Sequence, residues 1–173
     1  MGILHTCIMG VLPWVPPPLM RRLSARYIAG ETLPEAMKER IANLRGINSW
    51  NRLINPRVKV SEQHKDAKAV YDLGIPDAHH PVVRTHPVSG GKALYVNPQF
   101  TLRIDGMEAD ESGALLEQLY AETHVPEYQF RLRWKPGTIT FWDNAATQHY
   151  AANDYYPNRR HMERVAVIGD RPY

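Results

Sequence analysis

Cysteine is almost absent from this sequence, since Cys7 is the only one among 173 residues. A disulfide within the chain is therefore excluded, which fits a reducing cytoplasm. No run of about 18 apolar residues occurs, so no transmembrane helix is expected. The apolar start of the chain lacks the basic region of a signal peptide and is interrupted by prolines. We therefore expect a cytoplasmic protein with no membrane partner.

A large excess of one charge is also missing. The 21 Lys and Arg residues nearly balance the 18 Asp and Glu residues, and the basic residues are spread along the chain. This distribution does not favour a nucleic-acid partner. Apolar residues make up 43% of the sequence, which is typical of a globular domain, and the length suits one domain.

Two stretches carry helical signals. Pro34-Glu35-Ala36 is typical of a helix start, and apolar residues then recur at helical spacing as far as Gly46, which predicts its end. A second helix is predicted to open at Asp110 or Ser112 and to end near His124. Residues 1–33, with their proline cluster, indicate loop with a short helix at most.

Strand signals dominate the second half of the chain. Besides a polar segment with a helical piece at 63–73, strands are predicted at 81–85, 92–96, 128–134, 138–142 and 162–168. Short strands separated by turns, with one helix between them, indicate an antiparallel sandwich or jelly roll with flanking helices.

One histidine and two arginines form the most informative constellation. His149 follows a predicted strand and turn, and Arg160 and Arg164 would share one face of a strand because they are four residues apart. If that strand returned beside the one that leads to His149, both guanidiniums would lie near the imidazole. A neutral imidazole suits Fe(II), and a guanidinium binds a carboxylate through two hydrogen bonds. Taken alone, a histidine near a strand end is more often structural, and two arginines on one face of a strand are usually solvated or salt-bridged.

Several blocks of sequence resemble the taurine dioxygenase (TauD/TfdA) family. The C-terminal block runs from Phe141-Trp142-Asp143-Asn144 through Thr147-Gln148-His149 to Arg159-Arg160, Arg164 and Gly169-Asp170-Arg171-Pro172. A central block, His80-Pro81-Val82-Val83-Arg84-Thr85-His86-Pro87 with Leu94-Tyr95-Val96-Asn97, is also similar, as is the stretch 126–134. The resemblance covers residues 34–173 and implies a double-stranded β-helix (jelly roll, cupin-like) that is incomplete at its N-terminus.

The resemblance also implies roles for four residues. His149 matches the distal histidine of an iron site with two histidines and one carboxylate, and Arg160 matches the arginine that pairs with the far carboxylate of 2-oxoglutarate. Arg164 matches the arginine that meets the anionic group of the substrate, and Trp50 aligns loosely with an aromatic residue beside the substrate. The implied activity is that of an Fe(II)- and 2-oxoglutarate-dependent dioxygenase, which uses O₂ to hydroxylate a sulfonate, sulfate ester or carboxylate.

Other notable residues have simpler interpretations. Asp143 and Asn144 are expected to shape the turn before His149, and His80 and His86 are expected to be structural. The expected core residues are Trp134, Trp142, Tyr95, Phe130, Leu115 and Leu119.

The chain departs from the family pattern in its first third. The His-x-Asp/Glu motif that supplies the other two iron ligands belongs upstream of Pro34, and neither that motif nor the family's Gly-Gly-Asp-Thr segment is found there. His64-Lys65-Asp66 has matching letters, but positions i and i+2 of a helix point in nearly opposite directions. His5-Thr6-Cys7 replaces the carboxylate by a thiol, which favours softer metals.

These departures lead to a hypothesis about domain organisation. Residues 1–33 are interpreted as an atypical, aberrant leader, and residues 34–173 as the C-terminal part of a dioxygenase domain. A chain with one of three iron ligands should turn over poorly or not at all.

Two alternatives stay open. The chain could be a non-catalytic remnant or binding module that retains the sheet and the arginine clamps, or an unrelated jelly roll whose arginines form surface ion pairs. Members of the family often self-associate, so a homo-oligomer is one expectation; a chain that lacks core strands would instead expose apolar edges and aggregate.

Overall fold

The computed structural model describes residues 8–11, 20–25, 32–49, 76–135, 137–151, 163–166 and 171–173. Strands dominate these ranges, as the sequence predicts. They are β1 (Ile8–Val11), β2 (Met20–Ala25), β3 (Arg45–Asn48), β4 (Ala78–Pro81), β5 (Val83–Thr85), β6 (Lys92–Leu94), β7 (Thr101–Ile104), β8 (Gln129–Arg133), β9 (Ile139–Thr140), β10 (Thr147–Ala151) and β11 (Glu163–Ala166).

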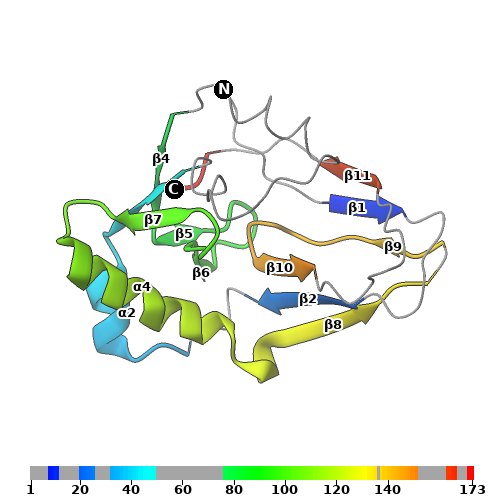
Figure 1. Ribbon diagram of the computed structural model, residues 1–173, viewed down its shortest axis with the longest axis horizontal. Helices are drawn as coiled ribbons and strands as arrows, with labels where there is room; N and C mark the ends of the chain where they lie inside the picture. The colour runs from blue at the N-terminus through cyan, green and yellow to red at the C-terminus, as the bar shows by residue number, and fades with distance from the viewer. Residues whose placement is uncertain are drawn as a thin grey trace, which may run out of the picture.

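Antiparallel pairing assembles these strands into four small sheets. Two have the orders β11-β1-β9 and β10-β2-β8, and they occupy the same end of the molecule (Figure 1). The other two are β4-β3-β7 and the hairpin β5-β6. In both of the first two sheets the middle strand comes from the first 25 residues and is paired with strands from the end of the chain.

The strands β1 and β2 correct one prediction. Residues 8–11 and 20–25 were expected to be loop with a short helix at most, and that expectation is wrong. Local propensity failed here because these segments are held by backbone pairing with distant strands, for example Ile8 with Ala166 and Leu23 with His149. The hypothesis that residues 1–33 are an aberrant leader concerns their origin and stays a prediction.

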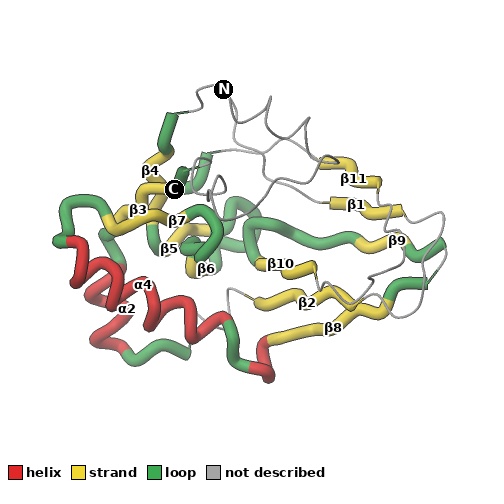
Figure 2. Tube along the Cα trace, viewed as in Figure 1, coloured by secondary structure: helices red, strands yellow, loops and turns green. Residues whose placement is uncertain are grey.

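Within the described ranges, two α-helices lie together at the end opposite these two sheets (Figure 2). They are α2 (Glu35–Ile41) and α4 (Ala109–Thr123), and a short 3₁₀ helix, η3 (Pro126–Tyr128), follows α4. Arg40 of α2 pairs with Glu111 of α4 at 3.0 Å, which joins the helices at their exposed surface. Helix α2 ends before the predicted stop, because Gly46 lies inside β3 instead.

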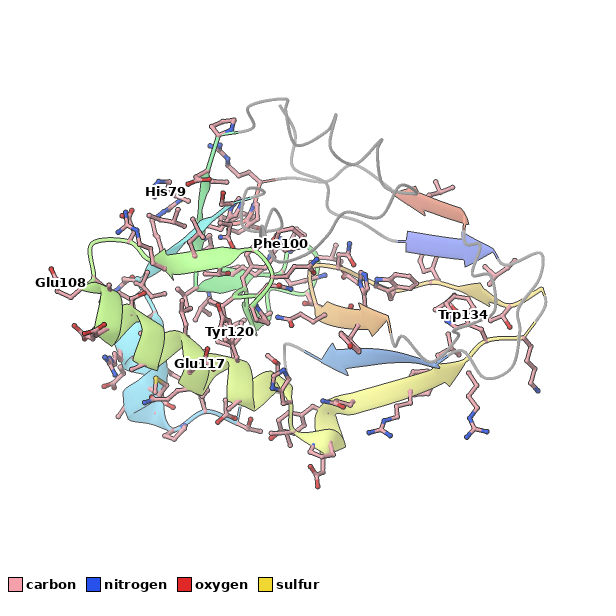
Figure 3. The ribbon with its side chains drawn as sticks, viewed as in Figure 1. His79, Phe100, Glu108, Glu117, Tyr120 and Trp134 are labelled. Atoms are coloured by element: carbon pink, nitrogen blue, oxygen red, sulfur yellow. The ribbon has the colours of Figure 1, made fainter. Side chains whose placement is uncertain are left out.

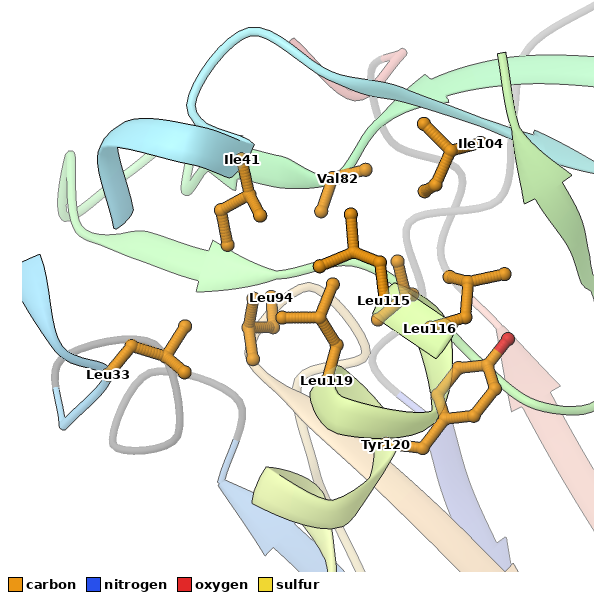
Figure 4. Close-up of a cluster of buried hydrophobic side chains, with 10 residues drawn as sticks. Leu33, Ile41, Val82, Leu94, Ile104, Leu115, Leu116, Leu119 and Tyr120 are labelled. Atoms are coloured by element: carbon orange, nitrogen blue, oxygen red, sulfur yellow. The ribbon is translucent and has the colours of Figure 1, made fainter. Parts of the chain in front are cut away.

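The main hydrophobic core lies between these helices and the strands β5, β6 and β7. Leu115 and Leu119 of α4 are fully buried there, as predicted, beside Ile41, Val82 and Leu94 (Figure 4). Each such side chain contributes about 1.5–3 kcal/mol by its burial. This core fixes α4 against the sheets.

Helix α4 has a polar outer face and an apolar inner face. Glu108 and Glu117 lie on its outer side, whereas Tyr120 points inward (Figure 3). The Tyr120 hydroxyl donates to the backbone oxygen of Thr101 in β7 at 3.3 Å. Buried Ser112 accepts the Ile104 N–H at 2.7 Å, which is a second link between α4 and β7. These bonds satisfy polar groups that would otherwise be costly to bury.

Two predicted core residues behave differently from each other. Trp134 is only 4% exposed, as predicted, whereas Phe130 is 60% exposed and is not a core residue. Phe130 was assigned to the core because apolar residues alternate along 128–134. Alternation identifies a face of a strand, but it does not tell whether that face is covered.

A cluster of aromatic and cationic side chains lies beside the β5-β6 hairpin. Arg84 is fully buried, and its guanidinium lies 5.0 Å from the centre of the Tyr95 ring. His80 meets the same ring edge-on, with ring centres 5.7 Å apart. The cation of Arg84 is attracted to the face of the Tyr95 ring, and the edge-on contact of His80 is a favourable ring geometry. These packing contacts fit the prediction that His80 is a structural residue.

Candidate functional site

His149 is the predicted site residue that the structure describes most fully. It lies within β10, in register with Leu23 of β2, and its side chain is exposed. The sequence predicted His149 after a strand and turn; the turn is present, but His149 belongs to a strand of its own. A strand position gives the imidazole a fixed direction relative to the sheet.

The turn before β10 is built around Asp143. One carboxylate oxygen, Oδ1, accepts the backbone N–H of Ala145 at 2.6 Å. The main-chain oxygen of Asp143 accepts both the N–H and the hydroxyl of Thr147, at 3.0 and 2.6 Å. Asp143 thus shapes this turn, as the sequence predicts, because its carboxylate accepts a backbone N–H group within the turn.

The other carboxylate oxygen of Asp143 reaches a distant part of the chain. His86, which directly follows β5, donates from Nε2 to Oδ2 of Asp143 at 2.6 Å. The His86 side chain is 12% exposed, and that of Asp143 is 46% exposed. Sequence reasoning did not pair these residues, which lie in separate blocks of the family resemblance.

The pKa of Asp143 reflects two opposing influences. Partial burial raises it, but hydrogen bonds from His86 and from the backbone N–H groups of Ala145 and Ala146 lower it by more. The pKa of Asp143 therefore lies below its ordinary value of 3.8, and the carboxylate is charged at neutral pH.

Trp142 connects the turn directly to His149. Its indole is 5% exposed, and Nε1 donates to Oδ1 of Asn144 at 2.9 Å. The rings of Trp142 and His149 meet edge-to-face, with centres 5.2 Å apart and planes at 64°. This is a favourable geometry for two aromatic rings and limits the orientations of the imidazole.

Gln148 ties β10 to the central block of the chain. Its side-chain Nε2 donates to the backbone oxygen of Val96 at 2.6 Å. Together with the pairing to β2, this bond holds the backbone on both sides of His149.

The predicted arginine wall is described only in part. Arg164 lies in β11, where Gly10 of β1 is its register partner, and Gly10 in turn pairs with Thr140 of β9. The sequence made a shared wall conditional on this strand returning beside the one that leads to His149; in the described strands, β1 lies between β11 and β9. The sequence could not reveal this, because β1 had been assigned to a loop.

Several other candidates cannot be placed. Arg160 and Trp50 lie outside the described residues, as do His5, Cys7, His64 and Asp66. Their predicted roles stay predictions.

Phe130 is a site candidate that sequence reasoning missed. Leu23 pairs with His149 on one side and with Phe130 of β8 on the other, so the three residues form one row across the sheet. Residues in one row of an antiparallel sheet face the same side. The exposed Phe130 ring therefore belongs to the His149 face, two strands away.

A hollow of about 750 Å³ lies elsewhere, between α2 and the β5-β6 hairpin. Its walls include Leu33, Lys38 and Lys92, and none of the predicted site residues contributes to them. We therefore place the candidate site on the His149 face and not in this hollow.

The described part of the chain does not by itself complete a metal centre. Within it, no group of three His, Cys, Asp or Glu side chains is arranged to hold a metal ion. His149 is an exposed imidazole that can ligate one, but a stable centre needs further ligands. The described side chains thus fit one position of an iron site and do not fit the whole.

Comparison with known proteins identifies the family and the fold to which the His149 face belongs. Residues 26–166 match the model of the family described as "Taurine catabolism dioxygenase TauD, TfdA family". A taurine dioxygenase from Burkholderia xenovorans aligns over 99% of this chain and 56% of its own, with 29% identity and a TM-score of 0.80. This likeness confirms the predicted jelly-roll (double-stranded β-helix) fold.

Two relatives carry names that specify a chemistry. The alpha-ketoglutarate-dependent sulfate ester dioxygenase of Pseudomonas putida is 33% identical over 83% of this chain and 48% of its own length. The alpha-ketoglutarate-dependent sulfonate dioxygenase of Saccharomyces cerevisiae is 39% identical over 54% of this chain and 23% of its own. Among four of the relatives it matches, the chain spans 36–48% of their lengths.

Proposed function

This chain belongs to the taurine catabolism dioxygenase TauD, TfdA family, and on that premise we propose that it forms part of a 2-oxoglutarate-dependent dioxygenase site for a small anionic substrate. The observation that carries the proposal is His149, an exposed imidazole held on β10 by the turn at Asp143 and the ring of Trp142. Alpha-ketoglutarate, named for the relatives, is the same compound as 2-oxoglutarate.

The proposed roles follow from the chemistry of each side chain. His149 is proposed as a ligand of Fe(II), because a neutral imidazole is a good ligand for this ion. Arg160 is proposed to bind the far carboxylate of 2-oxoglutarate, and Arg164 the anionic group of the substrate, since guanidinium groups bind oxyanions through paired hydrogen bonds. Trp50 is proposed to lie beside the substrate.

The proposed substrate is a sulfonate, a sulfate ester or a carboxylate, with O₂ as the other reactant. The first two classes are named for the relatives of Saccharomyces cerevisiae and Pseudomonas putida. The task of this chain's residues is to hold the reactants in place and to keep opposite charges near them. We propose a cytoplasmic location. Light scattering measures whether the chain self-associates. Along the described residues, no helix is long and apolar enough to cross a membrane.

An anaerobic titration tests the proposal. Fe(II) and 2-oxoglutarate are added together, and the weak visible charge-transfer absorption of their complex is recorded. We expect the absorption in the unmodified chain and its loss in His149→Ala. The matched control is His79→Ala, which removes another exposed imidazole, on β4, and should leave the absorption unchanged.

Calorimetry with 2-oxoglutarate separates the two remaining interpretations. If no absorption forms but 2-oxoglutarate binds, and Arg160→Ala abolishes that binding while Arg103→Ala does not, the chain is a non-catalytic binding module. Arg103 is an exposed arginine of β7 and serves as the charge-matched control. Absence of the absorption overturns the dioxygenase proposal, and absence of the binding as well rules out the binding module.

A further inference from the structure

We propose that His86 is a positioning residue for His149, acting through Asp143 and the turn at residues 143–147. The inference deepens the proposed function, because it rests on His149 as the site's imidazole. Its starting point is the short bond from Nε2 of His86 to Oδ2 of Asp143, which joins residues 57 positions apart. This bond connects the end of β5, which borders the main core, to the turn that leads into β10.

The hydrogen bonds of His86 fix which ring nitrogen carries the proton. Its Nδ1 accepts the backbone N–H groups of Val88 and Ser89, at 3.3 and 3.0 Å. A backbone N–H can only donate, so Nδ1 must be the bare nitrogen and the hydrogen must reside on Nε2. His86 is therefore a directional donor toward Asp143, and its ring is held by its own loop.

Asp143 transmits this constraint to the turn. Its carboxylate is shared between His86 and the N–H of Ala145, each at 2.6 Å, while its main-chain oxygen holds Thr147. Thr147 is the first residue of β10, and His149 follows two positions later. A displaced Asp143 would thus change the shape of the turn that precedes the strand carrying the imidazole.

Trp142 makes His149 sensitive to that displacement. The indole precedes Asp143 directly, is anchored to Asn144 on the other side, and packs edge-to-face on the His149 ring. A shift of the turn therefore moves the indole relative to the imidazole. Because Gln148 is bonded independently to Val96, β10 itself should stay in place when the turn is disturbed.

Nuclear magnetic resonance of the ring protons tests this without any metal. The His149 signals, assigned from their loss in His149→Ala, are shifted by the nearby Trp142 ring. In His86→Leu we expect the His149 ring and Trp142 indole signals to move well beyond their line widths. His86→Gln keeps an N–H that can donate to Asp143 and should restore most of the original shifts.

The matched control is a second histidine–aspartate pair. Nδ1 of His79 lies 2.8 Å from Oδ2 of Asp105, and both side chains are about half exposed. His79→Leu removes the same kind of bond at a place with no described contact to the turn. It should leave the His149 and Trp142 signals where they are.

Three outcomes would overturn the inference. One is an unchanged His149 signal in His86→Leu, and another is an equal shift in His79→Leu, which would show that the signals report general structure. The third outcome is a His86 ring hydrogen on Nδ1 instead of Nε2. Long-range nitrogen–proton correlations in the unmodified chain detect it, so this test still applies if His86→Leu fails to fold.

A metal measurement separates this inference from the proposed function. If the unmodified chain forms the Fe(II) and 2-oxoglutarate complex, its dissociation constant should rise about tenfold in His86→Leu and much less in His86→Gln. If the unmodified chain forms no such complex, the proposed function fails, while the proton-shift experiment still decides whether His86 positions His149.

Discussion

Replacing the Asp143 carboxylate by an amide is the sharpest test of the turn that supports His149. In the unmodified chain, the Ala145 N–H donates to Asp143 at 2.6 Å. In Asp143→Asn the remaining side-chain oxygen can still accept this bond. The new NH₂ group, however, would face the Nε2–H of His86, so two donors oppose each other. His86 cannot easily reverse its ring hydrogen, because Nδ1 already accepts two backbone N–H groups. The substitution therefore removes one charge-assisted hydrogen bond.

The expected cost follows from that bond. A hydrogen bond to a charged group contributes about 1.5–3 kcal/mol to stability. Because the Asp143 side chain is 46% exposed, solvent weakens the interaction, and we take the lower end, about 1.5 kcal/mol. For a chain of this size, that loss lowers the melting temperature by about 3–6 °C.

The loss should depend on pH in a defined direction. The pKa of Asp143 is lowered in the folded chain, so its contribution is complete above the unfolded value of 3.8 and disappears as pH falls through the folded pKa. Urea unfolding of both proteins between about pH 6 and pH 3 should show a difference that is constant at first and then closes in acid. A difference that is absent at neutral pH, or that persists undiminished in acid, would refute the reasoning.

Three further substitutions test the packing around the site. Leu119→Ala empties a fully buried position in α4 and should cost about 2–5 kcal/mol in urea unfolding, so a cost below about 1 kcal/mol would contradict the described core. Gly46→Ala would bring a Cβ within 3.2 Å of the Thr101 methyl group, which has little room to move because Thr101 is fully buried and its hydroxyl is bonded to Asn48 and Asn97. The substitution should destabilise by about 1–3 kcal/mol, which thermal unfolding measures. Gly113→Ala is its matched counterpart: nothing lies within 4 Å, and the helical position should gain about 0.5–1 kcal/mol, so equal effects at both glycines would argue against the described geometry.

The elements that the sequence predicted well are those with local signals. Helix α4 follows from its apolar stripe, and the bounds Ala109–Thr123 differ little from the expected ones. The β5-β6 hairpin follows from apolar strands around a glycine turn. Both depend on residues near each other in the chain, which periodicity and turn chemistry can detect.

The elements that were missed are held together by distant partners. Strands β3 and β7 pair with each other, and β1, β2 and β10 pair with segments from the opposite end of the chain. These strands are stabilised by pairing with distant segments, and no local sequence pattern predicts that pairing.

The candidate site could be predicted only in part. His149 was proposed because its surroundings in the sequence resemble a family block, and the turn role of Asp143 followed from its residue type. The link from His86 to Asp143 joins two blocks across the fold, so only coordinates reveal it. The exposure of Phe130 was mispredicted because a one-sided strand pattern does not say what covers that side.

The central placement of β1 and β2 has a consequence for how this protein is made. A ribosome synthesises these two strands well before their partners, because Ala166 follows Ile8 and His149 follows Leu23 only after a long stretch of chain. Until then both edges of each early strand are unsatisfied and available to other chains. Such high contact order slows folding and prolongs the interval in which aggregation competes. We therefore expect the yield of native protein to depend on chaperones and on slow translation at low temperature.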